Sequence, residues 1–251
     1  MKVKHIVLAI LVLSTLGFMN YPIDGYERTG IKRLYQLRKF QLDSVRYTRI
    51  PAGAYKKLED IKLNLVSKSS DSVNDLLVAD KDFERKLKRI IPSGRYSLAV
   101  MDMTNPNELK YAAHRENAGY QPGSVGKIAV LLAVFDQLQK LCPDSFEDRV
   151  GYLKNIRVTA RYWGTGDHHT VPIYDIENDR LRKRRVIASD EFSLYEWLDH
   201  MVSVSNNGAA SVMYREAMLM AAFGQEYFFL DAEKAETYFK DTPRDSLTNL
   251  A

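Results

Sequence analysis

The pattern of hydrophobic and polar residues predicts a β-hairpin followed by a long helix. Hydrophobic and polar positions alternate over residues 95–103, which is typical of a strand, and residues 109–115 continue the pattern after a turn at 105–108. A loop with Pro122 and Gly123 follows, and residues 128–141 are then apolar on nearly every side. Such a helix is expected to lie buried in the middle of a domain.

Five further stretches have helical periodicity. They are residues 75–91, 146–153, 193–202, 209–223 and 225–240. Ser193 and Glu196 form a capping-box pattern at the start of one, and Gly224 ends another. Alternation in residues 171–174 and 185–187 predicts a protruding hairpin, and residues 241–251 read as a loop. Strands and helices together indicate an α/β protein.

The first 19 residues look like a targeting segment. A basic start with Lys2 and Lys4 precedes an apolar run over residues 6–18, which is typical of a secretory signal peptide and short for a membrane span. An uncleaved inner-membrane anchor is the alternative, and it would be the protein's contact with a membrane. We therefore expect an exported protein in the periplasm or at the cell surface. Residues 20–74 are read as an N-terminal extension that packs on a domain formed by residues 75–251.

Composition narrows the function classes only slightly. With 251 residues, 45% of them hydrophobic, the chain can bury a sizeable core. The net charge of +4 is modest and says little about partners, whereas export argues against a nucleic-acid partner. A single cysteine, Cys142, excludes an internal disulfide and a cysteine-based metal site. No cofactor is indicated, and the sequence does not reveal the oligomeric state.

Ser124 and Lys127 are the most suggestive pair of residues. They follow the turn at Gly123 and are spaced so that both side chains lie on one face of a helix start. A serine hydroxyl becomes a nucleophile when a base takes its proton, and a neutral lysine in apolar surroundings can be that base. The helix N-terminus adds backbone N–H groups that can stabilise an oxyanion. The plainer interpretation is a surface helix start with an incidental lysine.

A second motif changes this balance. Ser205-Asn206-Asn207 lies on a short connection between two predicted helices, 81 positions after Ser124. Ser-x-x-Lys at a helix start followed by Ser-x-Asn between helices resembles the penicillin-recognising serine enzymes, which include class A β-lactamases and D-Ala-D-Ala peptidases. The strand–turn–strand before Ser124 and Met201 before the second motif also resemble that family.

The resemblance implies a fold and a set of roles. The fold would be a β-lactamase/transpeptidase-like sandwich with an α-helical subdomain. Ser124 would be acylated by a β-lactam or a D-Ala-D-Ala-type wall peptide, with Lys127 as base. Ser205 would relay the proton to the leaving nitrogen, and Asn207 would bind the substrate amide and orient Lys127. The Ser124 N–H would be half of the oxyanion hole, and no metal or cofactor would take part.

The sequence departs from the family pattern in two places. No Lys-Thr-Gly motif follows Asn207, and the glutamate that activates the deacylating water in class A enzymes is not evident near Asp241 or Asp245. We therefore expect a C-terminally truncated domain with an incomplete sheet, whose hairpin keeps an unpaired edge. A non-catalytic binding protein and a truncated, inactive product remain open beside the enzyme, as do lactamase and peptidase action.

Other notable side chains have plain structural interpretations. Asp167-His168-His169 could ligate a metal, but a polar loop explains them better because adjacent histidines seldom face one ion. His114 is read as a strand residue and His200 as a helix-end cap. The basic run at 180–185 fits a solvated hairpin face that could touch anionic lipid or wall polymer. The aromatic residues at 227–229 and 238–239 are read as core.

Overall fold

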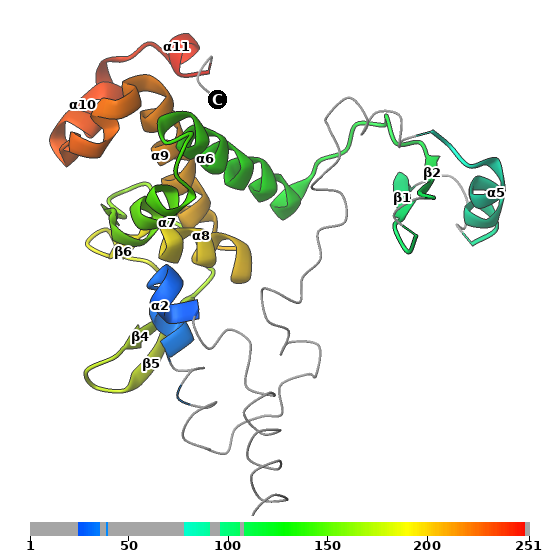
Figure 1. Cartoon of the computed structure of the whole chain (residues 1–251). Helices are drawn as coiled ribbons and strands as arrows, with labels where there is room; N and C mark the ends of the chain where they lie inside the picture. Colours follow the sequence, from blue (N-terminus) through cyan, green and yellow to red (C-terminus); the bar gives the residue numbers. More distant parts are fainter. Residues whose placement is uncertain (1–24, 36–38, 40–77, 91–95, 106–107, 249–251) are drawn as a thin grey trace, which may run out of the picture. The chain divides into compact units, whose positions relative to one another are not determined.

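The structure is a computed structural model that describes residues 25–35, 39, 78–90, 96–105 and 108–248 (Figure 1). The chain divides into two compact units, one formed by residues 58–122 and the other by the segments before and after it. The expected targeting segment at 1–19 and the boundary at residue 74 lie outside the described residues. A division between Pro122 and Gly123 is an addition to the sequence-based domain scheme.

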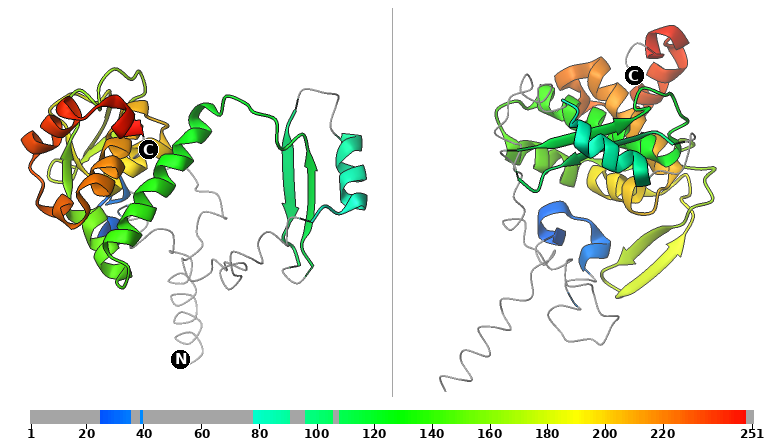
Figure 2. Two further views of the ribbon diagram at one scale, coloured as in Figure 1. Left: turned by 90° about the horizontal axis from the view of Figure 1, so that it is seen from above. Right: turned by 90° about the vertical axis from the view of Figure 1, so that its right-hand side faces the viewer.

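In its described residues, the smaller unit contains the predicted hairpin and one helix. Strand β1 (Leu98–Asp102) pairs antiparallel with β2 (Lys110–His114), with Val100 opposite Ala112. Helix α5 (Lys81–Ile90) lies alongside β2 (Figure 2), and Ala112 is fully buried. The hairpin and the strand position of His114 are therefore confirmed. The predicted helix is present but begins at Lys81 and not at residue 75, because Ala79 forms a bridge to Tyr111.

The larger unit is built around helix α9 (Asn207–Phe223), which packs on α6 (Lys127–Leu141) and on α8 (Leu194–Ser203). Helices α7 (Phe146–Asn155) and α10 (Ala232–Asp241) complete its predicted helices. The shorter elements are α2 (Gly25–Thr29), η3 (Gly123–Gly126), η4 (Gly224–Phe229) and α11 (Arg244–Thr248). The core includes Trp197, Val212 and Met213, which have no exposed surface. The prediction of a loop over residues 241–251 is wrong for part of that range, because α11 forms a helical turn there.

The strands of the larger unit form two small antiparallel sheets. Strand β3 (Arg157–Thr159) pairs with β6 (Glu191–Ser193), and β4 (Val171–Asp175) pairs with β5 (Arg180–Arg184). The second pair is the predicted hairpin, but its returning strand is the basic run at 180–184 and not residues 185–187. Most of β5 is exposed, as expected. Each sheet within the described residues has two strands, so the fold is a mixture of helices and small sheets.

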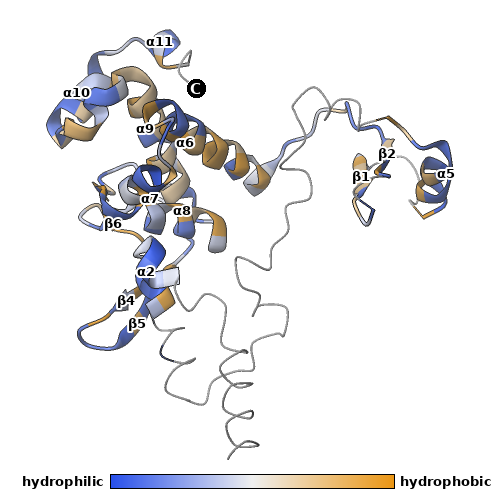
Figure 3. Ribbon diagram, in the orientation of Figure 1, coloured by the Kyte–Doolittle hydropathy of each residue, from blue (hydrophilic) through white to orange (hydrophobic). Residues whose placement is uncertain are grey.

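Helix α6 is less buried than its apolar sequence predicts. Val134 and Leu138 are buried, because these positions one turn apart form the side that faces the core. Ile128 and Leu132, in contrast, are 54% and 62% exposed. The apolar colouring continues along the helix in Figure 3. The expectation of a helix buried on all sides is therefore wrong, and one side of α6 carries exposed apolar residues.

Helix α8 is fastened at its start by the predicted capping box. The Ser193 Oγ accepts a hydrogen bond from the Glu196 N–H at 3.1 Å, and the Glu196 carboxylate accepts one from the Ser193 N–H at 3.2 Å. One residue further on, the Trp197 indole N–H donates to the Val158 carbonyl at 2.9 Å. These bonds tie α8 to both strands of the β3–β6 sheet, and so fix the helix that leads into Ser205.

The described part of the N-terminal extension packs on the larger unit, as predicted. Arg33 forms a two-pronged ion pair with Asp199 at 2.5 Å, and α2 contacts α7, where Lys154 donates to the Glu27 carbonyl. Among the described residues no helix combines the length and the apolar character that a membrane crossing needs.

His200 is a buried core residue and not the helix-end cap expected from the sequence. Its ring lies edge-on to Phe192 at 4.8 Å, and only 3% of the residue is exposed. Neither ring nitrogen has a hydrogen-bond partner among the described residues. Burial lowers the pKa of His200 to about 4, despite the nearby Asp199 carboxylate.

We expect His200 to make the protein less stable in mild acid. Between its unfolded value of 6.5 and its folded pKa of about 4, the unfolded chain binds a proton that the folded chain does not. The free energy of unfolding should therefore fall by about 3 kcal/mol as the pH drops through this window. Urea unfolding of His200→Leu should show a smaller decline between pH 6.5 and 4 than unfolding of the parent protein. Equal slopes in His200→Leu and the parent would contradict this.

Candidate active site

Ser124 and Lys127 are brought together by a change of helix type. Gly123 has a φ of +54°, a left-handed conformation that favours glycine, and it starts the single 3₁₀ turn η3. The chain passes into α6 at Lys127, so the two side chains lie on one face. Ser124 is exposed and Lys127 is buried, and the lysine Nζ lies 3.2 Å from the serine Oγ.

Ser205 and Asn207 reach the same place from the junction of α8 and α9. Ser205 has a φ of +59°, which turns the chain sharply between the helices. The buried Asn206 caps α9 by accepting a hydrogen bond from the Ala209 N–H at 2.7 Å. Because Asn206 points inward, its two neighbours are left to face α6.

Lys127 is the centre of the cluster. Its Nζ lies 2.7 Å from both the Asn207 Oδ1 and the Ser205 carbonyl, and 3.0 Å from the Ser205 Oγ. The Ser205 hydroxyl is itself 2.9 Å from the Ser124 Oγ. The structure thus brings together all four residues predicted from the two motifs. One amine nitrogen is within hydrogen-bond distance of both hydroxyls, so a proton can pass from either hydroxyl to the other through it.

Asp167 is a residue of this cluster that sequence reasoning missed. Its carboxylate is only 3% exposed and accepts hydrogen bonds from the backbone N–H of Asn207 and, at 3.3 Å, from its Nδ2. His169 holds the same carboxylate, with its Nδ1 2.8 Å from Oδ1. Burial raises the pKa of Asp167, but the hydrogen bonds from His169 and Asn207 outweigh it and hold the pKa well below its usual range. The carboxylate is therefore ionised beside Asn207.

The Asp167-His168-His169 group also bears on the question of a metal. One donor atom from each residue lies within 4.8 Å of the others, which is close enough to consider an ion. His168 is 76% exposed, however, and the oxygens of Asp167 already accept hydrogen bonds from Asn207 and His169. These contacts favour the structural interpretation of the three residues over a metal site.

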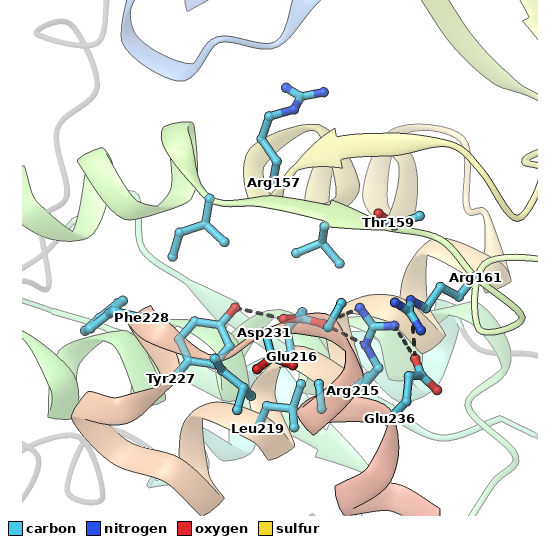
Figure 4. Close-up of a pocket in the computed structure, with 15 residues that line it drawn as sticks. Arg157, Thr159, Arg161, Arg215, Glu216, Leu219, Tyr227, Phe228, Asp231 and Glu236 are labelled. Atoms are coloured by element: carbon cyan, nitrogen blue, oxygen red, sulfur yellow. Dashed lines mark hydrogen bonds and ion pairs between the residues drawn. The ribbon is translucent and has the colours of Figure 1, made fainter.

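A separate cavity of about 340 Å³ lies between β3, α9, η4 and α10 (Figure 4). Its wall holds a buried ion pair, Arg215–Glu216 at 2.7 Å, and the Tyr227 hydroxyl donates to Glu216 at 2.9 Å. None of the four motif residues lines it.

Tyr227 belongs to the core and Phe228 packs against it, as predicted, whereas Phe229 is 90% exposed and departs from that prediction.

Comparison of the chain with protein-family models, curated proteins and solved structures finds no match. A function for the Ser124 cluster therefore has to come from the chemistry of its residues.

Proposed function

We propose that this protein is a serine acyl-transfer hydrolase that forms an acyl-enzyme on Ser124 with β-lactams or D-Ala-D-Ala-type wall peptides. The observation that carries the proposal is the position of the Lys127 Nζ, 3.2 Å from the Ser124 Oγ and 3.0 Å from the Ser205 Oγ. The finer fold assignment, a β-lactamase/transpeptidase-like sandwich with an α-helical subdomain, and the exported location are part of the same proposal.

The reaction follows from the placement of the four side chains. The Lys127 amine takes the Ser124 proton as the serine oxygen attacks the substrate carbonyl. In this reaction the Ser124 N–H, in the 3₁₀ turn before α6, donates a hydrogen bond to the oxyanion that forms. The proton then moves from Lys127 through the Ser205 hydroxyl to the leaving nitrogen, whose bond to the carbonyl carbon breaks. Water completes hydrolysis of the ester and releases Ser124.

A non-catalytic binding protein of the same fold is the second candidate, and one observation favours it. Four acceptor atoms surround the Lys127 Nζ, namely the Asn207 Oδ1, the Ser205 carbonyl and two hydroxyls. A charged lysine has three hydrogens, all of which these atoms can occupy. In that state the cluster offers charge and hydrogen bonds to a ligand but no base, so it would recognise a β-lactam without opening it.

Labelling with a fluorescent penicillin separates the two candidates. We expect one covalent adduct on the parent protein, visible on a denaturing gel and as the added mass of one penicillin, and no adduct on Ser124→Ala. Ser246→Ala, an exposed serine on α11, should label like the parent and serves as the matched control. Reversible binding with no adduct would support the binding protein. An adduct that persists in Ser124→Ala would place the nucleophile elsewhere.

A further inference from the structure

We propose that Asp167 is a positioning residue that fixes which end of the Asn207 carboxamide faces Lys127. This inference rests on the proposed function, because its consequence is the placement of the lysine that activates Ser124. Asp167 lies 40 positions before Asn207, in the loop formed by residues 164–169. Its contacts in the described residues are with Asn207 and the neighbouring histidines, and not with Ser124.

The 164–169 loop contacts three consecutive residues, Asn206, Asn207 and Gly208, at the connection between α8 and α9. The His169 carbonyl accepts a hydrogen bond from the Asn206 Nδ2 at 3.0 Å. Asp167 accepts from the backbone and the side chain of Asn207. Gly164 lies so close to Gly208 that a Cβ on Gly208 would come within 2.1 Å of the Gly164 carbonyl oxygen. The loop thus holds the connection along its length, and Asp167 is the ionised group within it.

The chemistry of a carboxamide gives Asp167 its specific effect. The oxygen and nitrogen of Asn207 are nearly equal in size, so hydrogen-bond partners decide which end points where. An ionised carboxylate only accepts hydrogen bonds, and it therefore selects the Nδ2 end, found at 3.3 Å. That choice leaves Oδ1 to accept from the Lys127 Nζ at 2.7 Å.

The reversed carboxamide would undo the arrangement around Lys127. An NH₂ group facing the amine sets donor against donor, so the lysine loses one of its two shortest contacts. A displacement of about 1 Å at a reacting group can slow a reaction on the order of a hundredfold. In the observed orientation, the Asn207 NH₂ group points toward Asp167. It has two hydrogens, so one can be donated to Asp167 and the other to the amide carbonyl of the substrate.

His169 and His168 are the titratable groups that face the carboxylate. The His169 Nδ1 lies 2.8 Å and the His168 Nδ1 lies 3.5 Å from the Asp167 Oδ1. The backbone N–H of His169 points at the same oxygen at 3.3 Å. These contacts keep Asp167 in place, so the selection of the Asn207 end depends on the charge of Asp167 and not on a chance rotamer.

Asp167→Asn tests the proposal, because it keeps the shape of the side chain and removes its charge. We expect the second-order rate of Ser124 labelling by fluorescent penicillin to fall about ten- to a hundredfold. Asp175→Asn is the same change at the half-buried end of β4, where the carboxylate accepts hydrogen bonds from Asn178, and it should label at the parent rate. In an Asn207→Ala background, Asp167→Asn should add little further loss, because the carboxamide through which it acts is already gone.

The outcomes separate this inference from the proposed function. A parent labelling rate in Asp167→Asn overturns the positioning role and leaves the acyl-enzyme intact, and so does a loss that simply adds to that of Asn207→Ala. If the parent itself takes no label, the proposed function fails. Thermal unfolding of the parent, the two single variants and the double variant then tests whether Asp167 and Asn207 interact. Shifts in midpoint that are smaller in the double variant than the sum of the two singles support it, and additive shifts overturn it.

Discussion

Replacing Lys127 by methionine should lower the rate of Ser124 acylation by about 10²–10⁴-fold, the range that a positioned general base contributes. Methionine retains an unbranched apolar stem but has no amine to take the Ser124 proton or to return it through Ser205. The hydroxyls of Ser124 and Ser205 are 2.9 Å apart in the parent protein, but neither hydroxyl is a base by itself.

The measurement is the time course of labelling by fluorescent penicillin, followed to completion at several concentrations. Lys140→Met is the matched control, because Lys140 lies on the same helix, is 62% exposed and pairs with Asp136 one turn away. It should label at the parent rate. A Lys127→Met protein that unfolds at a similar urea concentration and still labels at the parent rate would show that Ser124 is activated by another group.

The residues that sequence could place are those linked by local rules. The spacing of Ser124 and Lys127 on one turn, the capping box of Ser193 and the alternation in the hairpins each depend on neighbours within a few positions. The Ser205 connection follows from the helix signals on either side. Once α6 and α9 pack together, these local features place two hydroxyls and a carboxamide around one amine.

The features that sequence missed depend on contacts between distant segments. Asp167 meets Asn207 across 40 positions, and no periodicity or turn signal marks such a pairing. His200 sits in the last turn of α8, where a cap is the usual interpretation, but the helix rotates its ring toward Phe192. The exposure of Ile128 likewise depends on what surrounds α6, because an apolar run alone does not say how many of its sides meet other elements.

Substituting Gly208 by alanine should be the most damaging glycine-to-alanine change among the glycines that the structure describes. The new Cβ would lie 2.1 Å from the carbonyl oxygen and 2.7 Å from the carbonyl carbon of Gly164, and these backbone atoms cannot swing aside as a side chain can. Gly164 has little room to retreat, because its N–H is bonded to the Ala160 carbonyl at 3.0 Å. We expect a loss of about 1–3 kcal/mol in the free energy of unfolding, typical of overpacking at a buried site.

Activity should suffer together with stability, because the clash lies next to the contacts of Asn207. Moving the 164–169 loop away from Gly208 also moves Asp167 from Asn207, so labelling of Ser124 should slow about a hundredfold in protein that is still folded. Gly151→Ala is the control: nothing lies within 4 Å of the added Cβ in the middle of α7, and alanine should stabilise that helix by about 0.5–1 kcal/mol. A Gly208→Ala protein with parent stability and parent labelling would mean that the loop and the connection are not in tight contact in solution.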